Sequence, residues 1–287
     1  MSAPRVISAI VAIAIALGMI CLGGWYFTVL FCIIVFLGQQ EYFQLVQAKG
    51  IEPAARTTLV VSQIFLVIST LSSSIADAIL PVAGTFICFY LLFQPKIATI
   101  ADIAASILGL FYGGYLPSYW VRLRGLGSAE VANLPLGGYF PTSLDLKSMP
   151  DGLVLTLLAF GCIWAADIGA YIFGKMFGKT RLSAISPKKT VEGAVFGVSA
   201  SIGVAVLGAW YLEWPAWPLS GMALGLMIGI ASLLGDLTES MMKRDVGVKD
   251  SGKLIPGHGG ILDRTDSYVF TSPLVFYFVT LLLPLLQ

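Results

Sequence analysis

The sequence predicts an all-α integral membrane protein with about nine transmembrane helices. Of its 287 residues, 57% are hydrophobic and only 11% are charged, against about a quarter charged in soluble domains. Mean hydropathy is +0.87. Seventeen Lys and Arg nearly balance 16 Asp and Glu, so no overall charge attracts nucleic acid. The composition excludes a soluble globular protein, a disordered chain and a nucleic-acid partner.

Nine apolar stretches approach the roughly 20 residues that a helix needs to cross the hydrocarbon core. They cover residues 6–23, 25–42, 57–75, 77–94, 98–120, 152–174, 191–212, 218–242 and 267–286. The first follows Arg5 but lacks a small-x-small cleavage site, so we expect a retained helix rather than a signal peptide. Gly23 and Gly24 separate the first two stretches, and the run from Ser73 to Asp77 separates the third and fourth.

Lys and Arg fall unevenly on the two sides that nine spans define. Fourteen of the 17 lie on the side of the N-terminus, and the exceptions are Arg122, Arg124 and Lys147. Cytoplasmic loops collect Lys and Arg. We therefore expect a cytoplasmic N-terminus and, after an odd number of spans, a C-terminus outside.

The chain divides into two parts by chemistry rather than by a linker. Residues 1–150 are expected to form helices one to five, with a long external loop at 121–151 that is rich in Gly and Pro. Residues 151–287 are expected to form helices six to nine, whose cytoplasmic loops carry most of the polar groups and form the catalytic part.

Two aspartates lie within or at the end of apolar helices, where a charge is expensive. Asp167 and Asp236 are therefore candidate functional residues, and a structural ion pair or cap is the equal alternative. Asp167, Ala170, Tyr171 and Gly174 share one helical face. That face fits close packing of small residues, or a polar cavity in which Asp167 and Tyr171 bind substrate.

The loop before the seventh stretch contains Ser186, Pro187, Lys188 and Lys189 just before a helix start. Ammonium groups and the free N–H groups of a helix N-terminus both favour phosphate. An anion site is one interpretation of this loop. The other is a simple cytoplasmic anchor, since such loops collect lysines in any case.

The last cytoplasmic segment mixes acids and cations in a way that solvated surface does not explain. Asp236, Glu239, Ser240 and Lys243 share one helical stripe, and a glycine-rich run around His258, the single His of the sequence, follows. Carboxylates that bind Mg²⁺, beside lysines that bind phosphate, are typical of phosphoryl or nucleotidyl transfer. His258 fits a phosphate contact, a general base or a structural role.

One string of residues carries a specific family resemblance. It runs Ser240-x-x-Lys243-Arg244-x(4)-Lys249-Asp250-x(3)-Leu254-Ile255-Pro256-Gly257-His258-Gly259-Gly260-x-x-Asp263-Arg264-x-Asp266. This string resembles the signature of the CDP-diacylglycerol synthases, also called phosphatidate cytidylyltransferases. Glu41-Tyr42 and Ser186-Pro187-Lys188-Lys189 add weaker resemblance elsewhere in the chain.

The resemblance implies a membrane enzyme that joins CTP to phosphatidic acid in phospholipid biosynthesis, releasing pyrophosphate at the cytoplasmic face of a bacterial-type inner (plasma) membrane. It implies Mg²⁺ on Asp236 and Asp263, with a second monovalent or divalent cation, and it gives a weak expectation of a homodimer. The implied catalytic residues are Lys189, Lys249, Asp250, His258, Arg264 and Asp266. The implied substrate-binding residues are Ser186, Lys188, Ser240, Lys243 and Arg244, together with Asp167 and Tyr171.

Two alternatives stay open on the sequence alone. A related CTP-using enzyme would use the same metal-binding carboxylates and act on another lipid, such as a polyprenol. A secondary transporter would use Asp167 and Asp236 as proton or cation sites, although polar groups gathered in one half favour an enzyme. The run of four aspartates expected of CDP-alcohol phosphotransferases is absent from the sequence.

Overall fold

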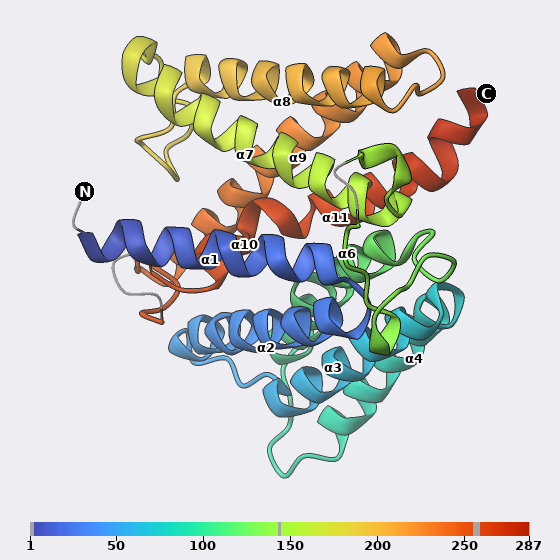
Figure 1. Cartoon of the computed structure of the whole chain (residues 1–287). Helices are drawn as coiled ribbons and strands as arrows, with labels where there is room; N and C mark the ends of the chain where they lie inside the picture. The colour runs from blue at the N-terminus through green and yellow to red at the C-terminus, as the bar shows by residue number, and fades with distance from the viewer. Residues whose placement is uncertain (1–2, 143–144, 255–258, 287) are drawn as a thin grey trace.

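The computed structural model describes residues 3–142, 145–254 and 259–286, and in these ranges the chain is helical, with isolated β-bridges in place of strands (Figure 1). The helices are α1 Ala3–Leu22, α2 Gly24–Ala48, α3 Ala55–Leu71, α4 Ser73–Leu92, α5 Ile100–Leu110, η1 Phe111–Tyr115, α6 Leu116–Gly125, η2 Pro135–Gly137, η3 Leu146–Ser148, α7 Asp151–Phe177, α8 Val191–Tyr211, α9 Trp217–Asp245, α10 Leu262–Val269, α11 Thr271–Tyr277, η4 Phe278–Leu282 and η5 Leu283–Leu286. The all-α prediction is confirmed for this part of the chain.

Seven helical segments among the described residues are long and apolar enough to cross a membrane. They are Gly24–Ala48, Ser73–Leu92, Ile100–Gly125, Asp151–Phe177, Val191–Tyr211, Trp217–Asp245 and Leu262–Leu286. Two shorter apolar helices, Ile13–Leu22 and Ala55–Leu71, correspond to the first and third expected spans. The protein is thus of the integral membrane type, and the count of nine spans stays a prediction.

The first expected break occurs at Gly23 and Gly24, whereas the run from Ser73 to Asp77 belongs to α4 and the second break lies one residue before it. Gly23 and Gly24 both have positive φ, at 61° and 50°, a conformation that residues with a Cβ rarely adopt. A Cβ on either residue would also collide, with the Arg124 side chain or with the backbone of Gly137. The second break falls at Ser72, whose hydroxyl accepts a hydrogen bond from the Ile75 N–H and so caps α4.

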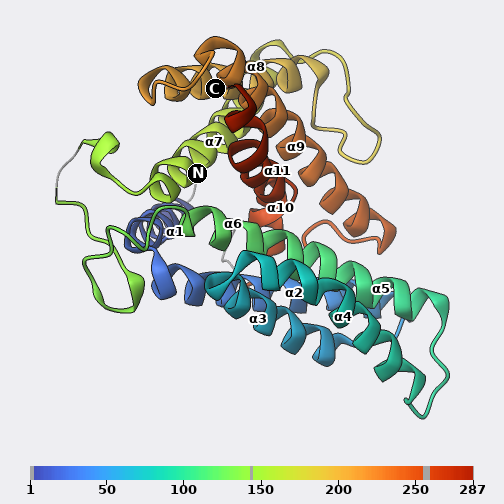
Figure 2. The same ribbon diagram turned by 90° about the vertical axis from the view of Figure 1, so that its right-hand side faces the viewer.

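The helices form two groups with α10 and α11 between them (Figure 2). Helices α7, α8 and α9 pack on one another, and α2, α3, α5 and α6 form the second group. Helix α10 contacts both α9 and α2, and α11 contacts both α9 and α6. The short α10 therefore joins the two groups in the middle of the molecule.

The two ends of the bundle carry different segments (Figure 1). The start of α1, the loop 178–190 and the segment that follows α9 lie at one end, where Lys49 Nζ is 2.8 Å from Asp245 Oδ1. The chain ends at the other, near the α8–α9 turn, where the Lys147 ammonium is 2.6 Å from Glu213 and lowers the pKa of that carboxyl. Exposed Trp210 at this end is typical of an aromatic belt at a membrane surface.

The long connection is shorter than expected, because α6 continues to Gly125 and leaves 126–150 rather than 121–151 outside helix α6. Arg122 and Arg124 consequently lie in the helix and are buried, not in an external loop. Arg122 Nη1 is 2.6 Å from Asp77 Oδ1, and its guanidinium stacks over the Tyr119 ring. Arg124 donates to the carbonyls of Ile20 and Cys21 at the end of α1.

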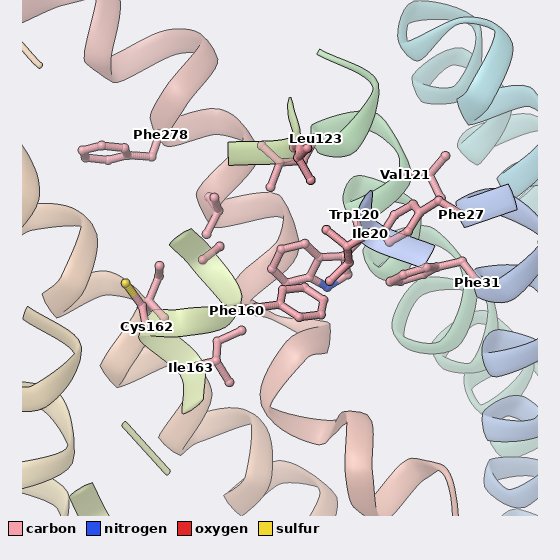
Figure 3. Close-up of a cluster of buried hydrophobic side chains, with 14 of the residues drawn as sticks. Ile20, Phe27, Phe31, Trp120, Val121, Leu123, Phe160, Cys162, Ile163 and Phe278 are labelled. Atoms are coloured by element: carbon pink, nitrogen blue, oxygen red, sulfur yellow. The ribbon is translucent and has the colours of Figure 1, made fainter. Parts of the chain in front are cut away.

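A buried aromatic core holds α7 against the N-terminal helices (Figure 3). The Trp120 and Phe160 rings meet edge to face with 4.8 Å between centroids, and Phe27 and Phe31 on α2 are 4.6 Å apart. Because such side chains bury large apolar areas in fixed geometries, this core fixes the position of α7 relative to α2 and α6.

Candidate active site

Helix α9 presents one polar stripe, as its sequence predicted. Ser240 Oγ lies 3.3 Å from Asp236 Oδ1, and the Lys243 ammonium forms an ion pair with Glu239 one turn earlier. Glu239 is fully buried, and its Oε1 has no hydrogen-bond partner among the described residues. A buried carboxylate of this kind requires a cation close by.

Asp263 connects this stripe to α10 and to the segment after α9. Its Oδ1 is 2.6 Å from Lys243 Nζ. Its Oδ2 accepts hydrogen bonds from the N–H of Gly260 at 2.8 Å, from the N–H of Ser251 at 2.9 Å and from the Ser251 hydroxyl at 3.0 Å. The Lys243 ammonium and two backbone N–H groups hold the side chain as an anion in a fixed orientation, and the Ser251 hydroxyl shares its one proton between Asp263 and Glu41.

Lys189 reaches the same stripe from the loop 178–190. The loop is closed by a hydrogen bond from the Leu182 N–H to the Lys189 carbonyl at 2.9 Å, and Thr190 caps α8 through its hydroxyl. Lys189 Nζ lies 2.5 Å from Asp236 Oδ2, whereas Lys188 is exposed. Lys189 is thus part of the polar centre, and a simple surface anchor does not describe it.

Two further carboxylates lie close to Asp236. Asp167 accepts a hydrogen bond from the Ser232 hydroxyl at 3.3 Å, and Asp266 accepts one from the Ser267 N–H at 2.7 Å. The charges of Asp167, Asp236 and Asp266 repel one another, while Lys189 attracts them. The structure therefore gathers three of the predicted acids around one predicted lysine.

The sequence left two interpretations of the α7 face open, close packing of small residues and a polar cavity, and each describes part of it. A Cβ on Gly197 of α8 would meet the Ala166 carbonyl at 2.6 Å, and one on Gly174 would lie 3.4 Å from the backbone of α8. Close packing of small residues therefore describes this contact. Asp167 instead lines a cavity, whereas Tyr171 is 70% exposed and is not among the described residues that line it.

Most of the remaining predicted residues lie on α9, on α10, in the loop 178–190 or in the segment after α9. Arg244 donates to the carbonyls of Ile185, at 3.3 Å, and Val248, at 2.9 Å, and so ties α9 to the loop 178–190. Ser186 is half-buried, and its carbonyl accepts from the Lys189 N–H at 3.0 Å. Exposed positions are held by Lys249, Asp250 and Arg264. His258 lies outside the described residues.

Glu41 is a site residue to which the sequence assigned no role. From α2 it accepts hydrogen bonds from the Ser251 hydroxyl at 2.9 Å, the Ile261 N–H at 3.0 Å and the Leu262 N–H at 2.9 Å. It thereby caps the start of α10 at Leu262, one residue before Asp263. The available signal was a carboxylate inside an apolar stretch, which is expensive unless it has partners.

The donor set fits a divalent cation that phosphate helps to hold. Among the described residues, no group of three or more His, Cys, Asp or Glu side chains is arranged as a complete metal site. Mg²⁺ in phosphate-transfer sites needs only one or two carboxylates besides phosphate oxygens and water. Asp236 and Asp263 each already hold a positive charge, the ammonium of Lys189 or Lys243. Both carboxylates are therefore anions with an affinity for cations.

Comparisons with known proteins agree with this chemistry. Residues 3–282 match the model of the cytidylyltransferase family. A phosphatidate cytidylyltransferase of Synechocystis sp. is 64% identical over all of this chain and 99% of its own length. The chloroplastic phosphatidate cytidylyltransferase 4 of Arabidopsis thaliana is 43% identical over 94% of this chain and 71% of its own. A Staphylococcus aureus phosphatidate cytidylyltransferase is 45% identical over 45% of this chain and 50% of its own.

The fold, the clustered acids and lysines, and these matches define the class of this protein, an integral membrane nucleotidyltransferase. The chain belongs to the cytidylyltransferase family. The resemblance found in the signature between Ser240 and Asp266 is thereby confirmed.

Proposed function

We propose that this protein is a phosphatidate cytidylyltransferase, which makes CDP-diacylglycerol from CTP and phosphatidic acid. A phosphate oxygen of phosphatidate attacks the α-phosphorus of CTP and forms a new P–O bond. The bond from that phosphorus to the bridging β-phosphate oxygen breaks, and pyrophosphate leaves with the electron pair. The nucleophile is already an anion, so the reaction needs no strong general base.

The observation that carries this proposal is the pairing of Lys189 with Asp236 and of Lys243 with Asp263 at one end of a membrane-type bundle. A polyanionic triphosphate attracts both ammonium groups, and their departure leaves two carboxylates beside the substrate phosphates. Nucleotidyl transfer needs both kinds of group, because cations neutralise the charge of the transferring group and fixed carboxylates hold the metal.

We assign Mg²⁺ to Asp236 and Asp263, with a second monovalent or divalent cation at the same centre. The bound cation would supply charge neutralisation at the phosphate oxygens. Asp167 and Asp266 add negative charge around Asp236. Glu239 also pairs with Lys243 from the buried side, so the ammonium keeps one carboxylate partner when it leaves Asp263.

The cationic residues bind phosphate in this proposal. Lys189 contacts the nucleotide phosphates, with Lys188 and Ser186 behind it on the same loop. Lys243, Arg244 and Ser240 of α9 bind the triphosphate. Lys249 and Arg264 are assigned to the triphosphate or to the lipid phosphate, and Asp250 and His258 are assigned as positioning groups. Tyr171 is proposed to contact the bound lipid from α7, in keeping with its exposure.

The active site is proposed to face the cytoplasm of a bacterial-type inner membrane. The loop 178–190 lies at the end of the bundle where α1 begins (Figure 1), and sequence positions at that end hold most of the Lys and Arg. CTP is available on that side. A homodimer is proposed on the family resemblance and is tested by cross-linking in native membranes.

Purified protein incubated in detergent with CTP labelled in the cytosine ring, phosphatidate and Mg²⁺ tests the function. We expect organic-soluble cytidine and pyrophosphate in equal amounts. A lipid kinase would release labelled CDP and leave no cytidine in the lipid. Product formed only with another lipid would support the assigned catalytic centre and show that the acceptor is not phosphatidate. No product with any lipid would contradict the proposed function.

Asp236→Asn and Asp263→Asn test the assigned centre in the same assay. Each should lower turnover by on the order of 10²-fold or more, as expected when a group that stabilises transferring charge is lost. Asp245→Asn is the matched control, because Asp245 ends the same helix but pairs with Lys49 at the surface. Full activity in both Asp236→Asn and Asp263→Asn would contradict the assignment.

A further inference from the structure

An apolar cavity of about 460 Å³ extends from the candidate active site into the bundle. Its volume is within the roughly 300–1,000 Å³ of small-molecule sites. Five helical segments contribute to its wall, namely α1, α2, the η1–α6 segment, α7 and α10. Asp167 and Arg264 line it, so the cavity is continuous with the centre that holds Asp236.

The lining changes from polar to aromatic along α7 and α2. On α7 it passes from Asp167 through Trp164 to Phe160, and on α2 it passes from Gln39 to Phe31 and then Phe27. Twelve residues of α2 correspond to about 18 Å at the helical rise of 1.5 Å per residue. The cavity is therefore elongated, with a polar end at the active site and an aromatic end.

The polar end holds groups that suit the oxygens of a lipid headgroup. Arg264 is cationic and exposed there. The hydroxyl of Tyr112 and the Gln39 Oε1 are buried and have no hydrogen-bond partner among the described residues. Asp167 repels a phosphate, and the Mg²⁺ of the proposed reaction would screen that charge. Unpaired buried polar groups are costly, and an ester or phosphate oxygen would accept a hydrogen bond from the Tyr112 hydroxyl.

The aromatic end is formed by the core already described. Figure 3 shows the Trp120 and Phe160 side chains against each other, with Ile20 and the Phe31 ring beside them, while Phe278 lies on the far side of the cluster. Trp120, Phe160 and Phe31 line the cavity, and all three are buried. Rigid rings at the end of a narrow apolar cavity limit the length of a ligand that enters it.

We propose that this cavity receives one acyl chain of phosphatidate and that Phe31, Trp120 and Phe160 set the chain length that the enzyme accepts. The inference rests on the proposed function, since it names the lipid as the occupant. The elongated cavity, which follows about 18 Å of α2, suits one acyl chain. The second chain stays in the bilayer.

Two variants test the length limit in opposite directions. Phe160→Ala removes a ring from the aromatic end, and Ala16→Phe adds one to the α1 wall of the cavity. Saturated phosphatidates that differ only in chain length are assayed at one mole fraction in detergent. Relative to wild type, the ratio of kcat/KM for the longest chain to that for the shortest should rise about tenfold in Phe160→Ala and fall by a similar factor in Ala16→Phe.

Phe278→Ala is the matched control. Phe278 is buried in the same hydrophobic cluster, and it is not among the described residues that line the cavity. It should leave the chain-length ratio unchanged while lowering stability as Phe160→Ala does. An equal shift in Phe278→Ala, or an unchanged ratio in Ala16→Phe, would overturn the proposal.

A readout without turnover separates this inference from the proposed function. Phosphatidate with a photoreactive diazirine near the methyl end of one chain is irradiated with the protein in detergent, and the labelled peptides are mapped. Label on α6 around Trp120 or on α7 around Phe160 supports the chain site even if no cytidine enters the lipid. Label confined to outward-facing positions such as Phe89 of α4, which is 59% exposed, would overturn it.

Discussion

The Glu41 carboxylate on α2 accepts a 2.9 Å hydrogen bond from the N–H of Leu262, 221 residues further along the chain. The same side chain accepts from Ile261 and Ser251. Helix α10 therefore begins at a cap that an N-terminal helix supplies. Since α10 carries Asp263, Arg264 and Asp266, the N-terminal half of the protein positions residues of the C-terminal signature.

Glu41→Gln should impair both stability and turnover. The amide that replaces one carboxylate oxygen is a donor, and it would face donors at the start of α10, where charge-assisted hydrogen bonds are worth about 1.5–3 kcal/mol each. Thermal unfolding in detergent and the cytidine-transfer assay measure the two effects. Glu52→Gln is the control, because Glu52 is exposed and pairs only with Lys96 among the partners described. Equal behaviour of the two variants would contradict the capping role.

Lys189→Met and Lys188→Met should differ sharply, although the two residues are adjacent. Lys189 loses its ion pair with Asp236, and turnover should fall on the order of 10²-fold or more. Lys188 is exposed, and its loss should raise KM for CTP by a few-fold through a weaker general attraction for phosphate. Steady-state kinetics with CTP as the varied substrate measures both. A larger effect at Lys188 would reverse the assignment of the two lysines.

Gly197→Ala should destabilise the α7–α8 contact. Its new Cβ would lie 2.6 Å from the Ala166 carbonyl, a distance that requires the helices to separate. Gly203→Ala on the same helix meets nothing within 4 Å and should be neutral or stabilising, because Ala is the better helix former by about 1 kcal/mol. Unfolding temperatures in one detergent compare them. A higher unfolding temperature for Gly197→Ala than for Gly203→Ala would contradict this packing argument.

Removal of divalent cations should abolish turnover and leave the fold intact. EDTA takes away the Mg²⁺ that the proposed reaction needs, while Lys189 and Lys243 still neutralise Asp236 and Asp263. Activity and thermal unfolding are measured on the same EDTA-treated sample, and activity should return when Mg²⁺ is added. Turnover that persists in EDTA would contradict the metal requirement, and a large fall in unfolding temperature would show that the lysines do not suffice.

The C-terminal polar centre could be predicted from the sequence, because its residues recur at helical spacing in one stripe and in one short signature. Glu239, Ser240 and Lys243 are neighbours on α9 for that reason alone. The sequence assigned Lys189 and Asp236 to the same reaction but did not predict their contact, because they lie on two separate segments of the chain. Glu41 could not be assigned a role, because its partners are more than 200 residues away.

The positions of Arg122 and Arg124 were predicted wrongly from the sequence pattern. Arg122 and Arg124 were expected in an external loop, because charges usually end an apolar span. The structure buries both, since Asp77 and aromatic rings compensate Arg122 and the free carbonyls at the end of α1 accept from Arg124. A hydropathy pattern does not show that groups distant in sequence can stabilise a buried arginine.

The lysine partners of Asp236 and Asp263 also bear on how the chain matures. Unpaired carboxylates near the membrane interior would make insertion and helix assembly depend on a supply of free divalent ion. Ammonium groups from the same polypeptide remove that dependence. The enzyme can therefore reach its folded state during biogenesis before it meets either metal or nucleotide.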